Sequence, residues 1–178
     1  MNRLRSHSSR LVACAFVATL VLALSACGFH LRDGLALPTD LGPVRVVSRD
    51  PYSPLAESLA KALERAGATP APERGGGQVA TLQVFSERFA DTAISVDQFG
   101  RAQEFSLRYA VVFSLRRAGE GGEIVPRQAI ELSRDYVASP RDSLGKNSER
   151  ELLTREMRRD MTQAILRRID AVSRKPNS

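Results

Sequence analysis

The stretch Gln103–Arg116, QEFSLRYAVVFSLR, decides the fold because its side chains alternate with a period of two. Apolar residues at every second position would share one face: Phe105, Leu107, Tyr109, Val111, Phe113 and Leu115. The opposite face is largely polar, with arginine or serine at positions 106, 108, 114 and 116. Such alternation is typical of an antiparallel strand with one buried face. It predicts a sheet that is covered on one side.

The neighbouring segments predict further strands joined by short turns. Val79–Val96 also has a period of two, with an irregularity expected around Asp91. The turn Asp97–Arg101 joins it to the central stretch, and the glycine-rich loop Gly119–Glu123 leads on to Ile124–Tyr136, another strand. Because short turns connect antiparallel neighbours, we expect these three strands to form an antiparallel sheet.

A short strand and a first helix precede these three strands. The β-branched run Val44–Ser48 predicts the strand. Ser53 stands at the N-cap and Pro54 at the first position of the helix, and Gly67 is a typical C-terminal glycine. Its apolar stripe has helical spacing and consists of Leu55, Leu59, Ala62, Leu63 and Ala66.

A second, longer helix is predicted near the C-terminus. A polar loop, Arg141–Asn147, leads to Ser148 and Glu151, which have the spacing of a capping box. Pro176 ends the helix. Its apolar stripe consists of Leu153, Met157, Met161, Ala164, Ile165, Ile169 and Val172, and we interpret the two methionines as core residues.

The expected order of elements is therefore β-α-β-β-β-α, which places the chain in the α+β class. One four-stranded, mostly antiparallel sheet with both helices packed on its apolar face would bury every apolar stripe. No internal repeat is visible in the 178 residues. The opposite face of the sheet stays open in this arrangement, so its partner becomes a structural question.

The N-terminus has the pattern of a bacterial lipoprotein signal. Basic residues precede the apolar run Leu11–Leu24, and Leu24-Ser25-Ala26-Cys27 resembles a lipobox. We expect residues 1–26 to be a signal peptide that is removed and residues 27–178 to form one domain, lipid-anchored at Cys27. An ordinary signal peptide with a chance cysteine is the alternative. Gly28, where an aspartate would retain such proteins in the inner membrane, indicates the outer membrane.

Composition argues against catalysis and cofactors. Two cysteines exclude a disulfide framework and a four-cysteine zinc site. Processing would remove Cys14 and acylate Cys27, and His30 would be the remaining histidine, close to the lipid anchor. We therefore predict no Ser-His-Asp or Cys-His catalytic set, no metal site and no cofactor. Gly75-Gly76-Gly77 lacks the lysine and serine or threonine of a phosphate-binding loop.

The net charge of +6 at first suggests nucleic acid as a partner. Three arginines leave with the signal peptide, so the 152 remaining residues carry +3, concentrated from Arg141 to Lys175. Ion pairs on a solvated helix face explain part of this excess. A secreted, membrane-tethered chain seldom meets nucleic acid, so anionic lipid is the favoured source of phosphate.

Cys27-Gly28-Phe29-His30-Leu31-Arg32, directly after the lipobox, resembles the start of mature proteins of the LptE family of lipopolysaccharide-assembly lipoproteins. The resemblance continues through Asp91-Thr92-Ala93, Gly100, Glu104-Phe105, Ser139-Pro140 and Lys146 into the last helix. It covers essentially the whole mature chain. The family resemblance implies two helices against a four-stranded sheet, in agreement with the order expected above.

The resemblance also implies partners and ligand contacts. Family members form a one-to-one plug complex inside the LptD β-barrel and bind lipopolysaccharide on its way to the outer leaflet. Their basic contacts lie in the turn between the middle strands and in the loop before the last helix. Lys146 matches the second position, whereas the first matches Gln98, with Arg101 nearby. Lys146 and Arg101 are thus the candidate lipopolysaccharide-binding residues.

The resemblance therefore predicts a non-catalytic, lipid-anchored protein at the periplasmic face of the outer membrane. An accessory lipoprotein of a different envelope assembly machine is the first alternative. An enzyme acting on lipid or cell wall is the second, and the missing catalytic residues disfavour it. Copurification with a large barrel protein and turnover of an envelope substrate distinguish these possibilities.

Overall fold

The computed structural model describes residues 37–38, 41–72, 78–119, 121–137 and 143–174. These residues belong to one compact unit, Leu35–Ser178. The expected signal peptide, the lipobox and Cys27 lie outside the described residues, as does the hexapeptide that begins at Cys27. Within the described part, the structure tests the expected elements directly.

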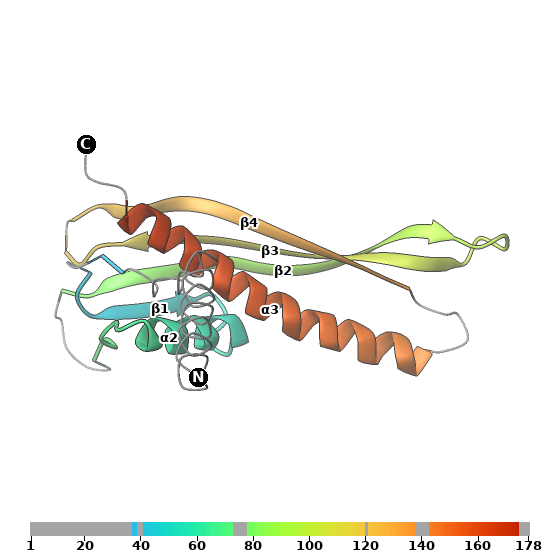
Figure 1. Cartoon of the computed structure of the whole chain (residues 1–178), viewed down its shortest axis with the longest axis horizontal. Coiled ribbons are helices and arrows are strands. Elements are labelled where there is room, and N and C mark those ends of the chain that lie inside the picture. The colour runs from blue at the N-terminus through green and yellow to red at the C-terminus, as the bar shows by residue number, and fades with distance from the viewer. Residues whose placement is uncertain (1–36, 39–40, 73–77, 120, 138–142, 175–178) are drawn as a thin grey trace, which may run out of the picture. The chain divides into compact units, whose positions relative to one another are not determined.

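Four strands and two helices follow one another in the predicted β-α-β-β-β-α order (Figure 1). They are β1 (Val44–Ser48), α2 (Pro54–Arg65), β2 (Ala80–Val96), β3 (Ala102–Arg116), β4 (Glu123–Val137) and α3 (Ser143–Ser173). The sheet has the order β1-β2-β3-β4, with β1 parallel to β2 and the other pairs antiparallel. The predicted α+β class and the mostly antiparallel sheet are confirmed.

Local sequence explains the bounds of α2. The hydroxyl of Ser53 accepts a hydrogen bond from the backbone N–H of Ala56 at 3.1 Å, which satisfies one of the free donors of the first turn. Pro54 occupies the first turn, where its missing N–H costs nothing. At the other end, Gly67 has φ +93°, the left-handed conformation that ends many helices. The predicted caps are confirmed.

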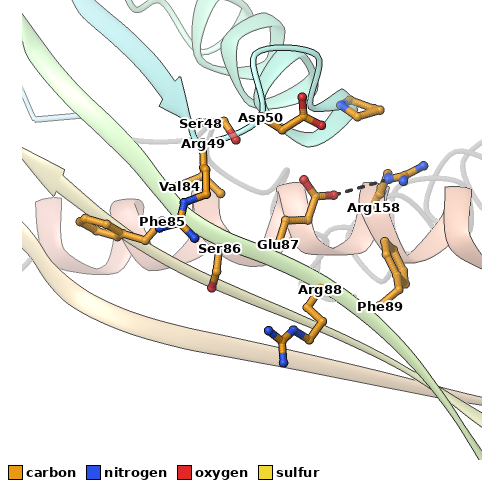
Figure 2. A pocket seen from close by; sticks show the side chains of 11 residues that line it. Ser48, Arg49, Asp50, Val84, Phe85, Ser86, Glu87, Arg88, Phe89 and Arg158 are labelled. Carbon is orange, nitrogen blue, oxygen red and sulfur yellow. Dashed lines mark ion pairs between the residues drawn. The ribbon is translucent and has the colours of Figure 1, made fainter.

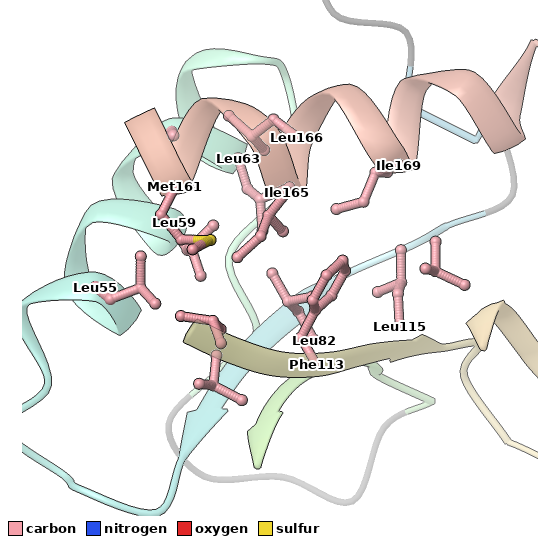
Figure 3. Packing of buried hydrophobic residues seen from close by; sticks show 14 of the residues in the cluster. Leu55, Leu59, Leu63, Leu82, Phe113, Leu115, Met161, Ile165, Leu166 and Ile169 are labelled. Atoms are coloured by element: carbon pink, nitrogen blue, oxygen red, sulfur yellow. The ribbon is translucent and has the colours of Figure 1, made fainter. Parts of the chain in front are cut away.

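The core lies between the two helices and one face of the sheet (Figure 3). The alternating residues of β3 from Leu107 to Leu115 are at most 1% exposed. The helices contribute Leu55, Leu59, Ala62, Leu63, Met157, Met161, Ile165, Leu166 and Ile169. Both methionines are fully buried, so their interpretation as core residues is confirmed.

The irregularity of β2 is not at Asp91, where we expected it. Asp91 pairs in continuous register with Leu107, and the register shifts fall instead at Phe85 and between Ala93 and Val96. The polar Asp91 interrupts the apolar pattern for another reason: its carboxylate bonds to a side chain of α3. The break in the hydrophobic pattern at Asp91 therefore reflects a tertiary contact with α3 and not a β-bulge.

Helix α3 begins at Ser143, earlier than predicted. The expected polar loop Arg141–Asn147 is therefore wrong for residues 143–147, and Ser148 with Glu151 lies inside the helix rather than at its cap. Gly145 and Asn147 are weak helix formers, which gave this segment the composition of a loop. Serine and glutamate three residues apart are also ordinary neighbours on a helix surface.

Candidate functional site

The β2–β3 hairpin reaches beyond the end of β4 and carries the candidate residue Arg101 (Figure 1). Its turn is held by Asp97, whose carboxylate accepts hydrogen bonds from the backbone N–H groups of Phe99 at 2.8 Å and Arg101 at 2.9 Å. Gly100 supplies φ +76°, a conformation that glycine adopts without steric cost. The turn that carries Arg101 is therefore held in one conformation by its own hydrogen bonds.

The guanidinium of Arg101 is partly engaged within this turn. Its Nε and Nη2 atoms each lie 2.7 Å from Asp97 Oδ2. The guanidinium carbon is 5.2 Å from the centroid of the Phe99 ring. The backbone N–H of Arg101 and its side chain keep the pKa of Asp97 below its usual value. No described residue binds Arg101 Nη1, and the side chain is 55% exposed, which leaves donors for an anion.

Exposed apolar side chains surround this turn. Ile94, Val96 and Phe99 are 51%, 62% and 71% exposed, and Val137 at the end of β4 is 64% exposed. Val96 pairs with Ala102 of β3, and Val137 pairs with Glu104, two residues further along the same strand. These four are most of the large exposed hydrophobic residues in the described part of the chain. We call Ile94, Val96, Phe99, Arg101 and Val137 the hairpin site. Its apolar side chains carried no strong sequence signal, because short exposed runs in a strand look like core residues.

The second candidate, Lys146, lies in the first turns of α3 rather than in a loop. Its side chain is outside the described part of the structure. The start of α3 lies toward the same end of the sheet as the hairpin (Figure 1). The structure thus places the backbones that carry the two candidates at one end of the fold and gives no contact between them.

A polar cluster joins α3 to the sheet near this end. Arg150 Nε donates to Asp91 Oδ2 at 2.6 Å, and the hydroxyl of Tyr136 donates to Asp91 Oδ1 at 3.3 Å. The bond to Asp91 raises the pKa of Arg150. Burial and the same carboxylate raise the pKa of Tyr136. Three elements, β2, β4 and α3, are therefore held together by one carboxylate.

A second polar cluster lies deeper, around Glu87 on β2. Its carboxylate accepts hydrogen bonds from the hydroxyls of Ser53 at 2.8 Å and Tyr109 at 2.7 Å, and Arg158 Nε lies 3.6 Å away (Figure 2). The Tyr109 ring stacks on Phe89 with centroids 3.9 Å apart. Burial, followed by the bond to Glu87, raises the pKa of Tyr109 strongly. Sequence reasoning missed this cluster because its members are far apart along the chain.

Neither cluster has the composition of a metal site. In the described ranges, no group of three or more histidine, cysteine, aspartate and glutamate side chains could hold a metal ion. The described helices also include none that is long and apolar enough to cross a membrane. Each carboxylate of the two clusters is matched by an arginine, an arrangement that orders structure.

Several solved structures have a similar fold. A lipoprotein B from Nitrosomonas europaea is 26% identical, with a TM-score of 0.64 over 81% of this chain and 91% of the other. The rare lipoprotein B from Shewanella oneidensis is 25% identical, with a TM-score of 0.62 over 73% and 95%. The chain thus has the same α+β fold as these two bacterial lipoproteins.

Sequence comparison gives the family. A family model described as LptE, lipopolysaccharide-assembly, matches residues 41–169. The LPS-assembly lipoproteins LptE of Photorhabdus laumondii and Yersinia pestis are each 30% identical over 149 residues, which are 84% of this chain and 80% and 70% of theirs. The chain belongs to the LptE family. The predicted membership of this family is confirmed.

Proposed function

We propose that this chain is a non-catalytic outer-membrane lipoprotein that plugs and helps to assemble the LptD β-barrel and binds lipopolysaccharide during its transport to the outer leaflet. Membership of the LptE family supports the role in assembly. The observation that carries ligand binding is the hairpin site, where exposed apolar side chains stand beside an arginine. An amphipathic ligand fits this combination.

The mature protein in this proposal begins at Cys27 and lies on the periplasmic face of the outer membrane. Residues 1–26 are removed as a signal peptide, and residues 27–178 form one domain. Acyl chains on Cys27 provide the anchor, since each buried CH₂ contributes about 0.8 kcal/mol and several chains hold a protein durably. The small residues Ser25 and Ala26 before the cysteine support this processing.

The open face of the sheet supports the role as a plug. Arg88, Arg108 and Glu131 lie on the face opposite the helices, and Arg108 pairs with Glu131 at 3.5 Å. Arg127 covers the Phe85 ring at 4.3 Å. The interior of a membrane β-barrel is polar. A sheet face of charged and small side chains is therefore suited to a barrel interior, whereas an apolar face would not be.

The hairpin site combines apolar side chains with a cation, and these match the acyl chains and the phosphates of lipopolysaccharide. Phe99 and Val96 can cover acyl chains, and the free donors of Arg101 can bind a phosphate of lipid A, for which the guanidinium fork is well shaped. Lys146 is the second proposed cation. Binding of phosphate by these residues would compete with bridging divalent ions and loosen lipopolysaccharide aggregates. No covalent chemistry is required.

Purification of the tagged full-length chain from outer membranes tests the proposal. We expect a stable one-to-one complex with the LptD barrel and lipopolysaccharide in the same fraction. Recovery with a different envelope assembly and without the barrel would overturn the proposal in favour of an accessory lipoprotein. Turnover of an envelope substrate by the purified chain would contradict the non-catalytic role.

A further inference from the structure

Strand β2 is much longer than its neighbour β1. The five residues of β1 pair with Ala80–Val84, so Phe85–Val96 is paired on one side only, with β3. Among the described residues, no strand pairs with the other side of this segment. Unpaired backbone N–H and C=O groups along a strand edge are a template for another strand.

The edge is regular and carries little protection. Between the two sites of register shift, Ser86–Ala93 pairs continuously with β3. It contains no proline, and two of its three charged side chains are engaged by α3, Glu87 by Arg158 and Asp91 by Arg150. Native edges are usually protected by proline, charge or a covering element. Ser86–Ala93 is therefore an edge on which a strand can add.

The opposite edge of the sheet is protected in this sense. Strand β4 contains Pro126 and four charged residues after it: Arg127, Glu131, Arg134 and Asp135. Two of these four are in ion pairs, Glu131 with Arg108 and Arg134 with Asp160 of α3. Proline removes a backbone donor, and charged side chains disfavour a neighbouring strand. Because both edges carry paired charges, Pro126 is the difference that favours β2 as the edge for strand addition.

A cavity lies at the start of the free β2 edge. It has a volume of about 360 Å³ and is lined by Ser48–Asp50 at the end of β1, by Val84–Phe89 and by Arg158 (Figure 2). Its lining includes two carboxylates, Asp50 and Glu87, and Glu87 is paired with Arg158. Arg49 and Arg88 also line it, and neither has an ion-pair partner among the described residues. An acidic side chain is the complement of these two arginines.

We propose that an extended strand of a partner protein adds to β2 along Ser86–Ala93 and places a carboxylate beside Arg49 and Arg88. The inference rests on the proposed function, in which a membrane protein surrounds this domain. Backbone hydrogen bonds supply the attachment, and the carboxylate sets the register. A second copy of this chain fits less well, because it would bring its own Arg49 and Arg88 to the same junction.

Hydrogen exchange of the full-length chain, alone and in the complex copurified from membranes, tests this inference. We expect peptides from Ser86–Ala93 to exchange at least ~10-fold more slowly in the complex, while the central segment Leu107–Leu115 is protected in both states. A complex without added protection overturns the strand addition and leaves the plug intact. Failure to recover any complex overturns the proposed function and this inference together.

A second outcome and a variant pair complete the test. Protection in the isolated chain together with a doubled mass would show that a second copy occupies the edge, which overturns the proposal.

Arg88→Glu should reduce recovery of the complex about 5–10-fold by repelling the carboxylate. Arg65→Glu at the exposed end of α2 makes the same change of charge and should leave recovery unchanged. Equal losses in both variants would contradict an acidic partner.

Discussion

Arg150 on α3 donates through Nε to Asp91 on β2 at 2.6 Å, across 59 residues of sequence. The hydroxyl of Tyr136 on β4 donates to the same carboxylate. This contact fixes the first half of α3 against the part of the sheet from which the hairpin extends. Lys146 lies one turn before Arg150, so this ion pair helps to hold the backbone that carries Lys146.

Removal of this ion pair should loosen the start of α3. Arg150→Ala is expected to lower the free energy of unfolding by about 1 kcal/mol, since the pair is charge-assisted but partly exposed. Urea denaturation measures the change. Arg155→Ala breaks an exposed helix pair with Glu151 at 4.0 Å and should cost less than about 0.5 kcal/mol. Equal losses in both variants would show that the bond to Asp91 has no special role.

The buried hydroxyl of Tyr109 should contribute more than an exposed one. Tyr109→Phe leaves one oxygen of Glu87 without its hydroxyl donor, which should cost about 1–2 kcal/mol. Chemical denaturation of the variant measures this loss. Tyr52, which is 89% exposed, provides the control, and Tyr52→Phe should leave the unfolding midpoint unchanged. A neutral Tyr109→Phe variant would mean that water replaces the hydroxyl at Glu87.

The raised pKa of Tyr109 predicts a loss of stability in alkaline solution. The unfolded chain releases this phenolic proton near the ordinary pKa of 10.0, whereas burial makes the folded chain retain it. The contribution of the protonated Tyr109 hydroxyl to the stability of the fold is thus fully present below pH 10 and is lost as pH rises above it. Urea midpoints measured from neutral to alkaline pH should fall above pH 10, and more steeply in the wild type than in Tyr109→Phe. Parallel curves would contradict this assignment.

Loss of the anchor should release the protein from the membrane. Cys27→Ser removes the thiol that the lipid requires, so we expect the chain to leave the outer-membrane fraction. Mass spectrometry of the wild-type chain should show acyl groups on residue 27 and absence of residues 1–26. A membrane-bound Cys27→Ser variant with an unmodified N-terminus would show that the anchor lies elsewhere.

The two candidate cations should matter for lipopolysaccharide binding. Reversing both charges, Arg101→Glu with Lys146→Glu, is expected to weaken binding about tenfold or more, because phosphate would meet carboxylates. Affinity for purified lipopolysaccharide is the measurement. Arg155→Glu with Lys61→Glu changes the net charge equally on exposed helix faces and serves as the control. Unchanged binding by the first pair would refute their role.

The periodic parts of the fold were predictable from sequence. Strand β1 has the expected bounds, and β3 differs from its expected start by one residue. Each strand buries one face, and this produces the apolar pattern from which the bounds were predicted. The α2 caps at Ser53 and Gly67 depend on local chemistry alone. Local rules failed at the start of α3, where Gly145 and Asn147 are helical despite weak intrinsic preference.

The candidate site was predictable only in part. The family resemblance made Arg101 a candidate, but its contacts with Asp97 and Phe99 required the structure. The unpaired edge of β2 depends on the length of β1 relative to β2 and on which strands become neighbours. The partners of Glu87 and Asp91 come from distant elements, and single-sequence patterns do not specify such tertiary contacts.

Photo-crosslinking at the hairpin site tests the central claim most directly. A photoreactive aromatic residue replaces Phe99 in one variant and Tyr52 in another, since both positions carry exposed aromatic rings, 71% and 89% exposed. After irradiation of living cells, we predict a lipopolysaccharide adduct at position 99 and none at position 52. Equal labelling at both positions, or labelling at position 52 alone, would contradict lipopolysaccharide binding by the hairpin.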